Sequence, residues 1–124
     1  MTKKMKIVNE SQGETLVESA KWCDSFGSKL RGFMFKSSLE THEGLVLVEG
    51  RDSKLQTSIH MLFVSFDLGV IWVNSAGVVV DTVVAKSWAL NYAPQEAARY
   101  VIEMHPDLLS QVKIGDRIVF EAVA

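Results

Sequence analysis

The sequence predicts an α+β domain that is mostly β, in which one helix covers a curled antiparallel sheet or partial barrel of about eight short strands. The first indication is a series of short runs rich in β-branched and aromatic residues, which recur between residues 45 and 123. The second is that only residues 19–31 carry apolar side chains at the three- and four-residue steps of a longer helix. Because regular helices do not alternate with the strands, a doubly wound parallel fold is not expected.

A single domain over residues 1–124 is expected. The chain of 124 residues is long enough to bury a core, and its 48% hydrophobic and 23% charged residues are typical of a folded globular protein. No repeat and no linker rich in proline, glycine or serine divides it.

The first predicted elements are a hairpin and the covering helix. Residues 6–9 and 15–17 are expected to pair across a glycine-containing turn. The helix over residues 19–31 would begin at the N-cap Ser19 and end at Gly32. Its apolar face would consist of Trp22, Cys23, Phe26 and Leu30.

The remaining elements are strands and one short helical turn. Residues 51–56 are expected to form a polar loop, and residues 74–77 a turn that joins two strands into a hairpin. A helical turn is predicted at residues 106–111, because proline is favoured at the first position of a helix. The expected strands are residues 45–48, 59–64, 68–73, 78–85, 100–104 and 117–123.

Composition argues against several classes of function. The formal net charge of -2 leaves no basic excess to neutralise phosphates, so no nucleic-acid partner is expected. No apolar run reaches the roughly 18 residues of a membrane span, and no apolar signal segment follows the N-terminal lysines. A single cysteine, Cys23, cannot form an internal disulfide, which fits a reducing compartment. We therefore expect a cytoplasmic protein without membrane association.

Neither a metal nor another cofactor is expected. The three histidines, His42, His60 and His105, lack the spacings that place two imidazoles on one metal ion. There is no glycine-rich phosphate loop or nucleophile elbow. Cys23 lies on the apolar face of the predicted helix without a second cysteine, so a buried structural thiol is favoured over a redox centre.

His60 and Asp67 interrupt the most apolar stretch, residues 58–77, and form the first candidate site. If both side chains point into a cleft, the carboxylate could orient the imidazole as a general base, and Glu103 is an alternative carboxylate. In the other interpretation, His60 bonds a neighbouring carbonyl and Asp67 sits at a turn, which Gly69 within a strand pattern also indicates.

A second candidate site lies in the loop after residue 84, which carries Lys86, Trp88, Asn91 and Tyr92. Tryptophan and tyrosine on a loop are common in binding sites because they supply large, stiff contact areas. The alternative is that these rings only cover the edge of the core.

Several short motifs between Leu16 and Phe120 occur in a recognisable order. They include Leu30-Arg31-Gly32-Phe33-Met34, Glu43-Gly44-Leu45-Val46-Leu47, Ser58-Ile59-His60-Met61-Leu62-Phe63, Lys86-Ser87-Trp88, Tyr100-Val101-Ile102-Glu103-Met104 and Ile114-Gly115-Asp116. The ordered set resembles the bacterial and archaeal family named domain of unknown function 192. The resemblance implies a compact β-rich domain and no agreed reaction, substrate or cofactor.

The chain departs from that family at two positions. The family pattern has a proline and, two residues later, an aspartate, where this chain has Asp67 and Gly69. A carboxylate moved by two residues along a strand keeps its face but shifts by about 6.5–7 Å, too far to replace a general base. The family's proline before Trp88 is here Ser87.

The sequence therefore favours a small soluble, non-catalytic domain that binds a small molecule or another protein. His60 would supply a polar contact, next to Lys86 and to apolar walls formed by Trp88 and Tyr92. The alternative is a small hydrolase or isomerase that uses His60 with Asp67 or Glu103. A third interpretation is a homodimer in which Trp72 or Trp88 anchors the interface.

Overall fold

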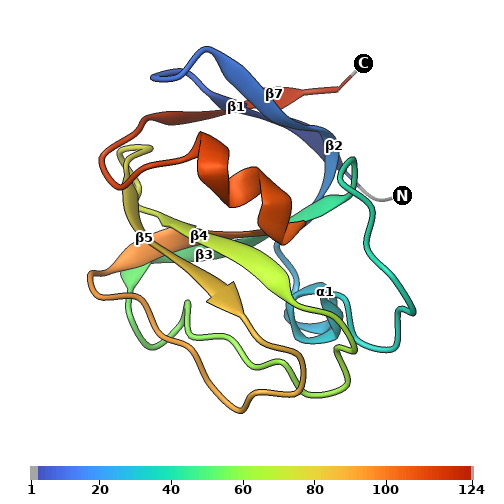
Figure 1. Ribbon diagram of the computed structural model, residues 1–124. Helices are drawn as coiled ribbons and strands as arrows, with labels where there is room; N and C mark the ends of the chain where they lie inside the picture. Colours follow the sequence, from blue (N-terminus) through green and yellow to red (C-terminus); the bar gives the residue numbers. More distant parts are fainter. Residues whose placement is uncertain (1–2, 124) are drawn as a thin grey trace.

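Seven strands form one curled sheet in the computed structural model, which describes residues 3–123 (Figure 1). The predicted mostly-β fold class is confirmed, and the sheet is a half-barrel. In chain order the elements are β1 (Lys4–Asn9), β2 (Glu14–Cys23), α1 (Phe26–Arg31), β3 (Gly44–Ser53), β4 (Leu68–Val73), β5 (Val79–Ala85), β6 (Ala98–Met104), the 3-10 helix η1 (Pro106–Gln111) and β7 (Ile118–Ala122).

The strand order explains how the sheet curls. From edge to edge the order is β5-β4-β6-β3-β2-β1-β7, and every pair is antiparallel except β2 with β3. A parallel pair needs a long crossover, which residues 24–43 with α1 provide. The edge strands approach each other at one end, where the Gly115 amide donates to the Val79 carbonyl at 2.8 Å and Val78 bridges Arg117. These bonds tie the half-barrel at that end.

Hydrophobic cores lie on both faces of the sheet. The inner core receives side chains from all seven strands, among them Ile71 and Ile102, and η1 packs against it. The outer core lies on the opposite face of β3, β6, β4 and β5 and includes Leu45, Val70 and Val101. β4 is buried along its whole length because it has a core on each side.

Irregular segments cover the outer core. Trp72 on β4 is only 1% exposed, and its indole N–H donates to the Thr57 carbonyl at 2.7 Å. Ile59 and Tyr92 exchange two backbone hydrogen bonds, at 2.8 and 2.9 Å. The segment around Thr57 is thus tied to the sheet and to the 86–97 loop, and Figure 1 shows both on the side of the molecule where α1 lies.

The predicted helix at residues 19–31 is wrong in its first half. β2 continues to Cys23, and α1 begins at Phe26 with Ser25 as its N-cap. The reason is strand pairing, since residues 21–23 pair with β3 and the preceding residues of β2 pair with β1. These non-local hydrogen bonds outweigh the modest helix propensity of the segment.

The expected apolar helix face is consequently dispersed. Trp22 packs against the inner core and Cys23 against the outer core, because adjacent residues of a strand point to opposite faces. Phe26 and Leu30 on α1 are 80% and 53% exposed. Gly32 ends the helix as predicted, with a φ of +45°.

A second prediction, the strand at residues 59–64, is also wrong. Only Ile59 forms a β-bridge there, and Phe63 has a φ of +62°, which is incompatible with a strand. Residues 51–53, expected in a loop, belong to β3. Within residues 3–123 there are therefore seven strands in place of about eight.

The turn signals were more reliable. The β1–β2 hairpin is present with Gly13 at a φ of +66°. Residues 74–77 connect β4 to β5, and Gly77 has a φ of +85°. The helical turn at residues 106–111 is the 3-10 helix η1.

We predict that Trp72→Phe lowers the free energy of unfolding by about 2 kcal/mol or more. The substitution removes the donor to the buried Thr57 carbonyl and leaves a small void. Trp88→Phe is the matched control, because this ring is 53% exposed and its replacement should change stability by less than about 0.5 kcal/mol. Urea unfolding measures both; equal losses would contradict an anchoring role for Trp72.

Candidate functional site

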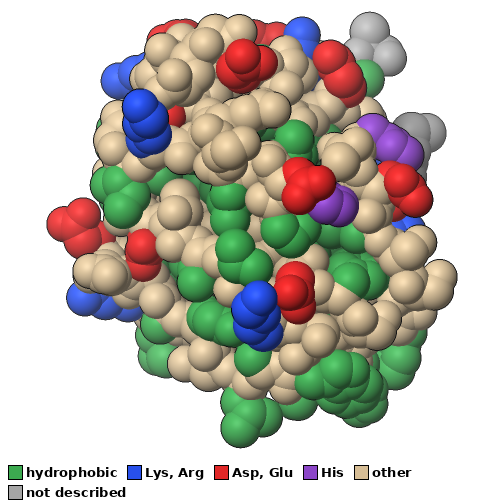
Figure 2. Space-filling model, viewed as in Figure 1, with side chains coloured by type: hydrophobic (Ala, Val, Ile, Leu, Met, Phe, Trp, Pro, Cys, Tyr) green, Lys and Arg blue, Asp and Glu red, His purple; other side chains and the backbone are tan. Residues whose placement is uncertain are grey.

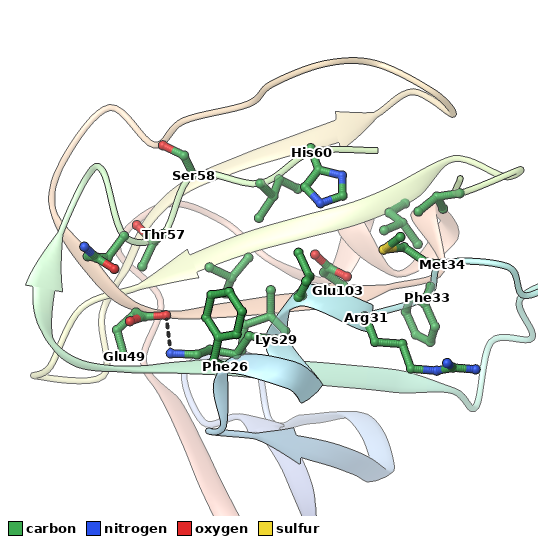
Figure 3. A pocket seen from close by; sticks show the side chains of 18 residues that line it. Phe26, Lys29, Arg31, Phe33, Met34, Glu49, Thr57, Ser58, His60 and Glu103 are labelled. Atoms are coloured by element: carbon green, nitrogen blue, oxygen red, sulfur yellow. Dashed lines mark hydrogen bonds and ion pairs between the residues drawn. The ribbon is translucent and has the colours of Figure 1, made fainter. Parts of the chain in front are cut away.

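A cavity of about 260 Å³ lies between α1, the outer face of β3 and β6, and residues 56–60 (Figure 3). Mainly apolar walls with a few polar groups are typical of small-molecule sites, and the volume is slightly below their usual range of roughly 300–1,000 Å³. The cavity therefore suits a compact ligand. Its apolar lining residues are Phe26, Leu30, Phe33, Met34, Leu47, Ile59, Val64, Leu68 and Val101.

Glu103 lies on the sheet side of this cavity. Its side chain shares the outer face of β6 with Val101, while Ile102 points into the inner core. Its register partners on the neighbouring strands are Leu45 and Val70, both aliphatic. The carboxyl therefore stands in an apolar row of the sheet, and the residue is only 6% exposed.

The Glu103 carboxyl has no hydrogen-bond partner within residues 3–123, and burial raises its pKa from 4.5 to about 7. The cause is that apolar surroundings disfavour the charged form. Near neutral pH the group thus exists in both protonated and ionised forms. The backbone of Gly32 passes close to it, since a Cβ at that position would lie 3.6 Å from Glu103 Oε1.

An ion pair borders the cavity beside α1. Lys29 Nζ of α1 lies 2.8 Å from Glu49 Oε2 of β3, and both side chains are largely shielded from solvent. In Figure 3 this pair is joined by a dashed line, and Arg31 points away from it and from His60. The Lys29 ammonium is therefore engaged by Glu49.

His60 enters the cavity from the opposite wall. Its half-buried ring accepts the Leu62 N–H on Nδ1 at 3.2 Å, so the neutral ring carries its proton on Nε2. The alternative prediction of a bond to a carbonyl is wrong, because the backbone group that it meets is an amide. Figure 3 shows His60 above the cavity and Glu103 below it, so the structure brings these two candidates together.

Asp67 does not line this cavity. Its carboxylate accepts the Ser87 N–H at 3.0 Å and lies 3.4 Å from Lys86 Nζ. The Ser87 hydrogen bond, with a smaller contribution from Lys86, lowers the pKa of Asp67. The arrangement matches the structural interpretation, in which Asp67 holds the turn and the loop that follows β5.

The other loop candidates lie outside the cavity as well. The Lys86 N–H donates to the Tyr92 hydroxyl at 3.0 Å, which closes the loop on itself. Trp88 packs edge-on against Phe63, with 5.3 Å between ring centroids, and Phe63 lies 5.0 Å from Phe35. These three rings are exposed and form an aromatic patch.

The two tryptophans proposed as interface anchors differ in exposure. Trp72 is buried, so that part of the prediction is wrong, whereas Trp88 is exposed and stays the candidate. Figure 2 shows hydrophobic side chains at the end of the molecule that carries the loops and α1 and across the middle of this face, with charges of both signs scattered among them.

Sequence reasoning missed the cavity residues of α1 and β3. Lys29, Phe33 and Glu49 come together with Glu103 only because the parallel crossover folds α1 over the sheet. One signal was available, since Glu103 is the only charged residue in the otherwise apolar stretch 100–104.

Cys23 is buried, as predicted, but at the end of β2 and not on a helix. Burial raises the pKa of its thiol, which disfavours the reactive thiolate. Within residues 3–123, no three His, Cys, Asp or Glu side chains are grouped to hold a metal ion. In the same range no helix has the length and apolar character to cross a membrane.

Comparison with known proteins identifies the family. The family model DUF192, described as uncharacterized ACR, matches residues 7–120. The chain belongs to DUF192. The resemblance predicted from the ordered motifs is therefore confirmed, over almost the same range of residues.

Archaeal relatives carry the name UPF0127. The UPF0127 protein TK1120 of Thermococcus kodakarensis is 36% identical over 114 residues, which cover 90% of this chain and 71% of that protein. A UPF0127 protein of Thermococcus gammatolerans is 35% identical over 117 residues, covering 93% and 74%. The UPF0127 protein PH1112 of Pyrococcus horikoshii is 33% identical over 114 residues, covering 90% and 96%.

Two solved structures share the fold. One, from Sinorhizobium meliloti 1021, is described provisionally as a transcription regulator; it has a TM-score of 0.81 and 17% identity, covering 97% of this chain and 94% of that one. The other, a protein of unknown function from Novosphingobium aromaticivorans DSM 12444, has a TM-score of 0.78 and 15% identity, covering 95% and 84%. At these identities the likeness concerns the fold alone.

The departure from the DUF192 pattern at Gly69 does not affect the cavity. Leu68 and Val70 point to the outer core, so a side chain at position 69 would point to the inner face. A Cβ there would lie 3.0 Å from Leu109 Cγ and 3.2 Å from Pro106 Cα, because η1 packs over the glycine. A carboxylate at this position would face away from the cavity.

We predict that Glu103→Gln raises the free energy of unfolding at pH 8 by on the order of 3 kcal/mol, because each pKa unit corresponds to about 1.4 kcal/mol. The folded carboxyl keeps its proton up to about pH 7, whereas the unfolded one releases it near 4.5. The contribution of Glu103 to wild-type stability should therefore be largest below pH 4.5, decline as the pH rises to about 7, and level off above that. The variant should lack this decline.

Urea unfolding between pH 4 and 8 measures the effect. Glu96→Gln is the matched control, because Glu96 is exposed in a loop and its replacement should keep the wild-type slope. If the free energies of unfolding of wild type and Glu103→Gln changed with pH in parallel across this range, the result would contradict a buried, unpaired carboxyl at Glu103.

Proposed function

We propose that this chain is a non-catalytic binding domain that holds a small organic molecule in the cavity between α1 and the sheet. The observation that carries the proposal is the Glu103 carboxyl, which is buried in an apolar row without a partner in the described part of the chain. Holding a carboxyl in apolar surroundings lowers the stability of the fold, because the charged form loses hydration there. An aliphatic residue would avoid this cost, and groups held in such surroundings gather at functional sites.

Few polar groups are available to orient a ligand. The hydroxyls of Thr57 and Ser58 already donate to the carbonyls of Ser53, at the end of β3, and of Lys54. Gln56 and Arg31 also line the cavity, but Gln56 is exposed and Arg31 points away from His60. Nε2 of His60 and the carboxyl of Glu103 lie on opposite walls (Figure 3). A ligand with an apolar body and one or two polar atoms would satisfy both and exclude water from the apolar walls.

Of the binding residues expected from the sequence, the proposed site retains His60. Its other residues lie in different elements from those expected. Lys86, Trp88 and Tyr92 give way to α1, β3 and β6, because these elements line the same cavity as His60 and the loop around Trp88 does not. The loop around Trp88 then supports the 56–60 segment from outside, through the Ile59–Tyr92 hydrogen bonds.

A small hydrolase or isomerase is the second candidate. It is favoured by one observation: a carboxyl with a pKa raised to about 7 shares a cavity with an imidazole. Such a carboxyl could act as a general acid or base, with His60 as the second proton-transfer group. Asp67 would take no part, since it holds the loop outside the cavity.

The binding proposal is tested by NMR with a library of small organic compounds. Hits should shift amide signals of cavity residues such as Gly32 and Ile59, and His60→Ala should weaken binding by about 3- to 10-fold for the loss of one hydrogen bond. Trp88→Ala should leave the affinity unchanged. Hits confined to the Trp88 loop, or a silent library, would overturn the proposal.

An assay for turnover distinguishes the enzyme hypothesis from the binding hypothesis. If the chain is a hydrolase, simple esters or amides that bind in the cavity should be cleaved, and both His60→Ala and Glu103→Gln should reduce kcat by about 100-fold or more. Compounds that bind without being converted support the non-catalytic domain.

A further inference from the structure

Resting on the proposed binding function, we infer that the ligand is a small organic cation: a protonated primary or secondary amine on an apolar body, with its N–H groups donated to Glu103. The carboxyl is 6% exposed, faces the cavity and lacks a hydrogen-bond donor in the described part of the chain. An ionised carboxylate only accepts hydrogen bonds, so the group that completes it must be a donor.

Each charged or titratable residue near Glu103 either bonds another group or points away from it. From α1, Lys29 pairs with Glu49 of β3 at 2.8 Å, and Arg31 points away in Figure 3. His60 uses Nδ1 to accept an amide N–H, and the Cys23 thiol donates weakly to the Lys21 carbonyl. β4 adds only apolar Leu68 to the lining. The positive charge that would balance Glu103 is thus left for a ligand to bring.

An amine fits this site better than a neutral donor does. A cation within hydrogen-bonding distance favours the ionised carboxylate, and such charge-assisted hydrogen bonds are roughly twice as strong as neutral ones. The aliphatic row around Glu103 keeps water away and strengthens the pairing. The Phe33 ring and the aliphatic walls would receive the apolar body.

The same pairing makes binding depend on pH with a definite sign. Glu103 must lose its proton to pair with the cation, and burial raises its pKa to about 7. Affinity for an amine should therefore rise with pH up to about 7, approaching tenfold per unit well below it, and stay level until the amine itself loses its proton. An alcohol of the same shape should show no such rise.

The experiment compares benzylamine, benzyl alcohol and benzoate, which share one ring and differ in charge. Dissociation constants are measured by NMR titration of the full chain between pH 5.5 and 8, following the cavity amides. Benzylamine should bind at least about tenfold more tightly than the alcohol at pH 7.5, and benzoate should bind more weakly than both. Glu103→Gln should remove the preference for the amine and its pH dependence, and leave the alcohol within about threefold.

Two further variants control for other charges. Glu96→Gln removes an exposed carboxylate outside the cavity and should bind all three probes like the wild type. His60→Ala should keep the rise with pH, which shows that Glu103 and not the imidazole is responsible. The wild-type pH profile alone tests the inference if Glu103→Gln does not fold.

The possible results separate the two proposals. If benzyl alcohol or benzoate binds in the cavity as tightly as benzylamine, or if the amine preference survives in Glu103→Gln, the inference fails and the binding function stands. If no probe and no compound of the wider library shifts the cavity amides, both fail.

Discussion

The neighbouring strands β4 and β6 have a hydrophobic core on each face of the sheet, and the arrangement of the rest of the chain follows from that. β4 is buried at every position, and β6 divides its side chains between the inner and outer cores. The curl of the sheet fills the inner side, but the outer side needs a separate cover. α1 and the irregular segments around Thr57 and Trp88 provide it. The Trp72–Thr57 hydrogen bond holds the Thr57 segment to the sheet, and the Ile59–Tyr92 bridge joins that segment to the loop that carries Trp88. Irregular segments cover a sheet less completely than a second sheet would, and the cavity lies where this cover meets β3 and β6.

Glu103 gives this cavity its chemical character. Had the outer row of β6 continued with an aliphatic side chain, the cavity would be an apolar hollow of little selectivity. Instead an ionisable group stands between Leu45 and Val70, with His60 on the opposite wall. Burial holds its pKa near the pH of ordinary cell interiors, so small changes in surroundings, including a bound cation, would shift its protonation. The same pair of side chains could thus bind a ligand or transfer a proton, and the DUF192 fold alone does not distinguish these two functions.

Local signals in the sequence predicted the local structure well. Glycine-containing turns before β2 and β5 and the proline at the start of η1 all lie where they were expected, because their backbone preferences act within a few residues. The helix from residue 19 failed because Trp22, Cys23 and Phe26 fit a helical stripe as well as a strand end followed by a turn. Pairing with β1 and β3 decided the matter, and this pairing is not visible locally. The cavity was only half predicted for the same reason: His60 and Glu103 interrupt apolar runs and stand out, whereas Lys29, Gly32 and Glu49 become cavity residues only through the crossover.

The account depends on a carboxyl that is folded into an apolar row without a partner. The most direct measurement is an NMR titration of the side-chain carboxyl carbon of Glu103 in the folded chain, with the other glutamates as internal references. The account predicts a midpoint near pH 7, well above the usual 4.5, and a fall of that midpoint when benzylamine is added. A midpoint at or below 4.5 in the free protein would show that Glu103 is solvated or already paired, and would contradict the proposed site.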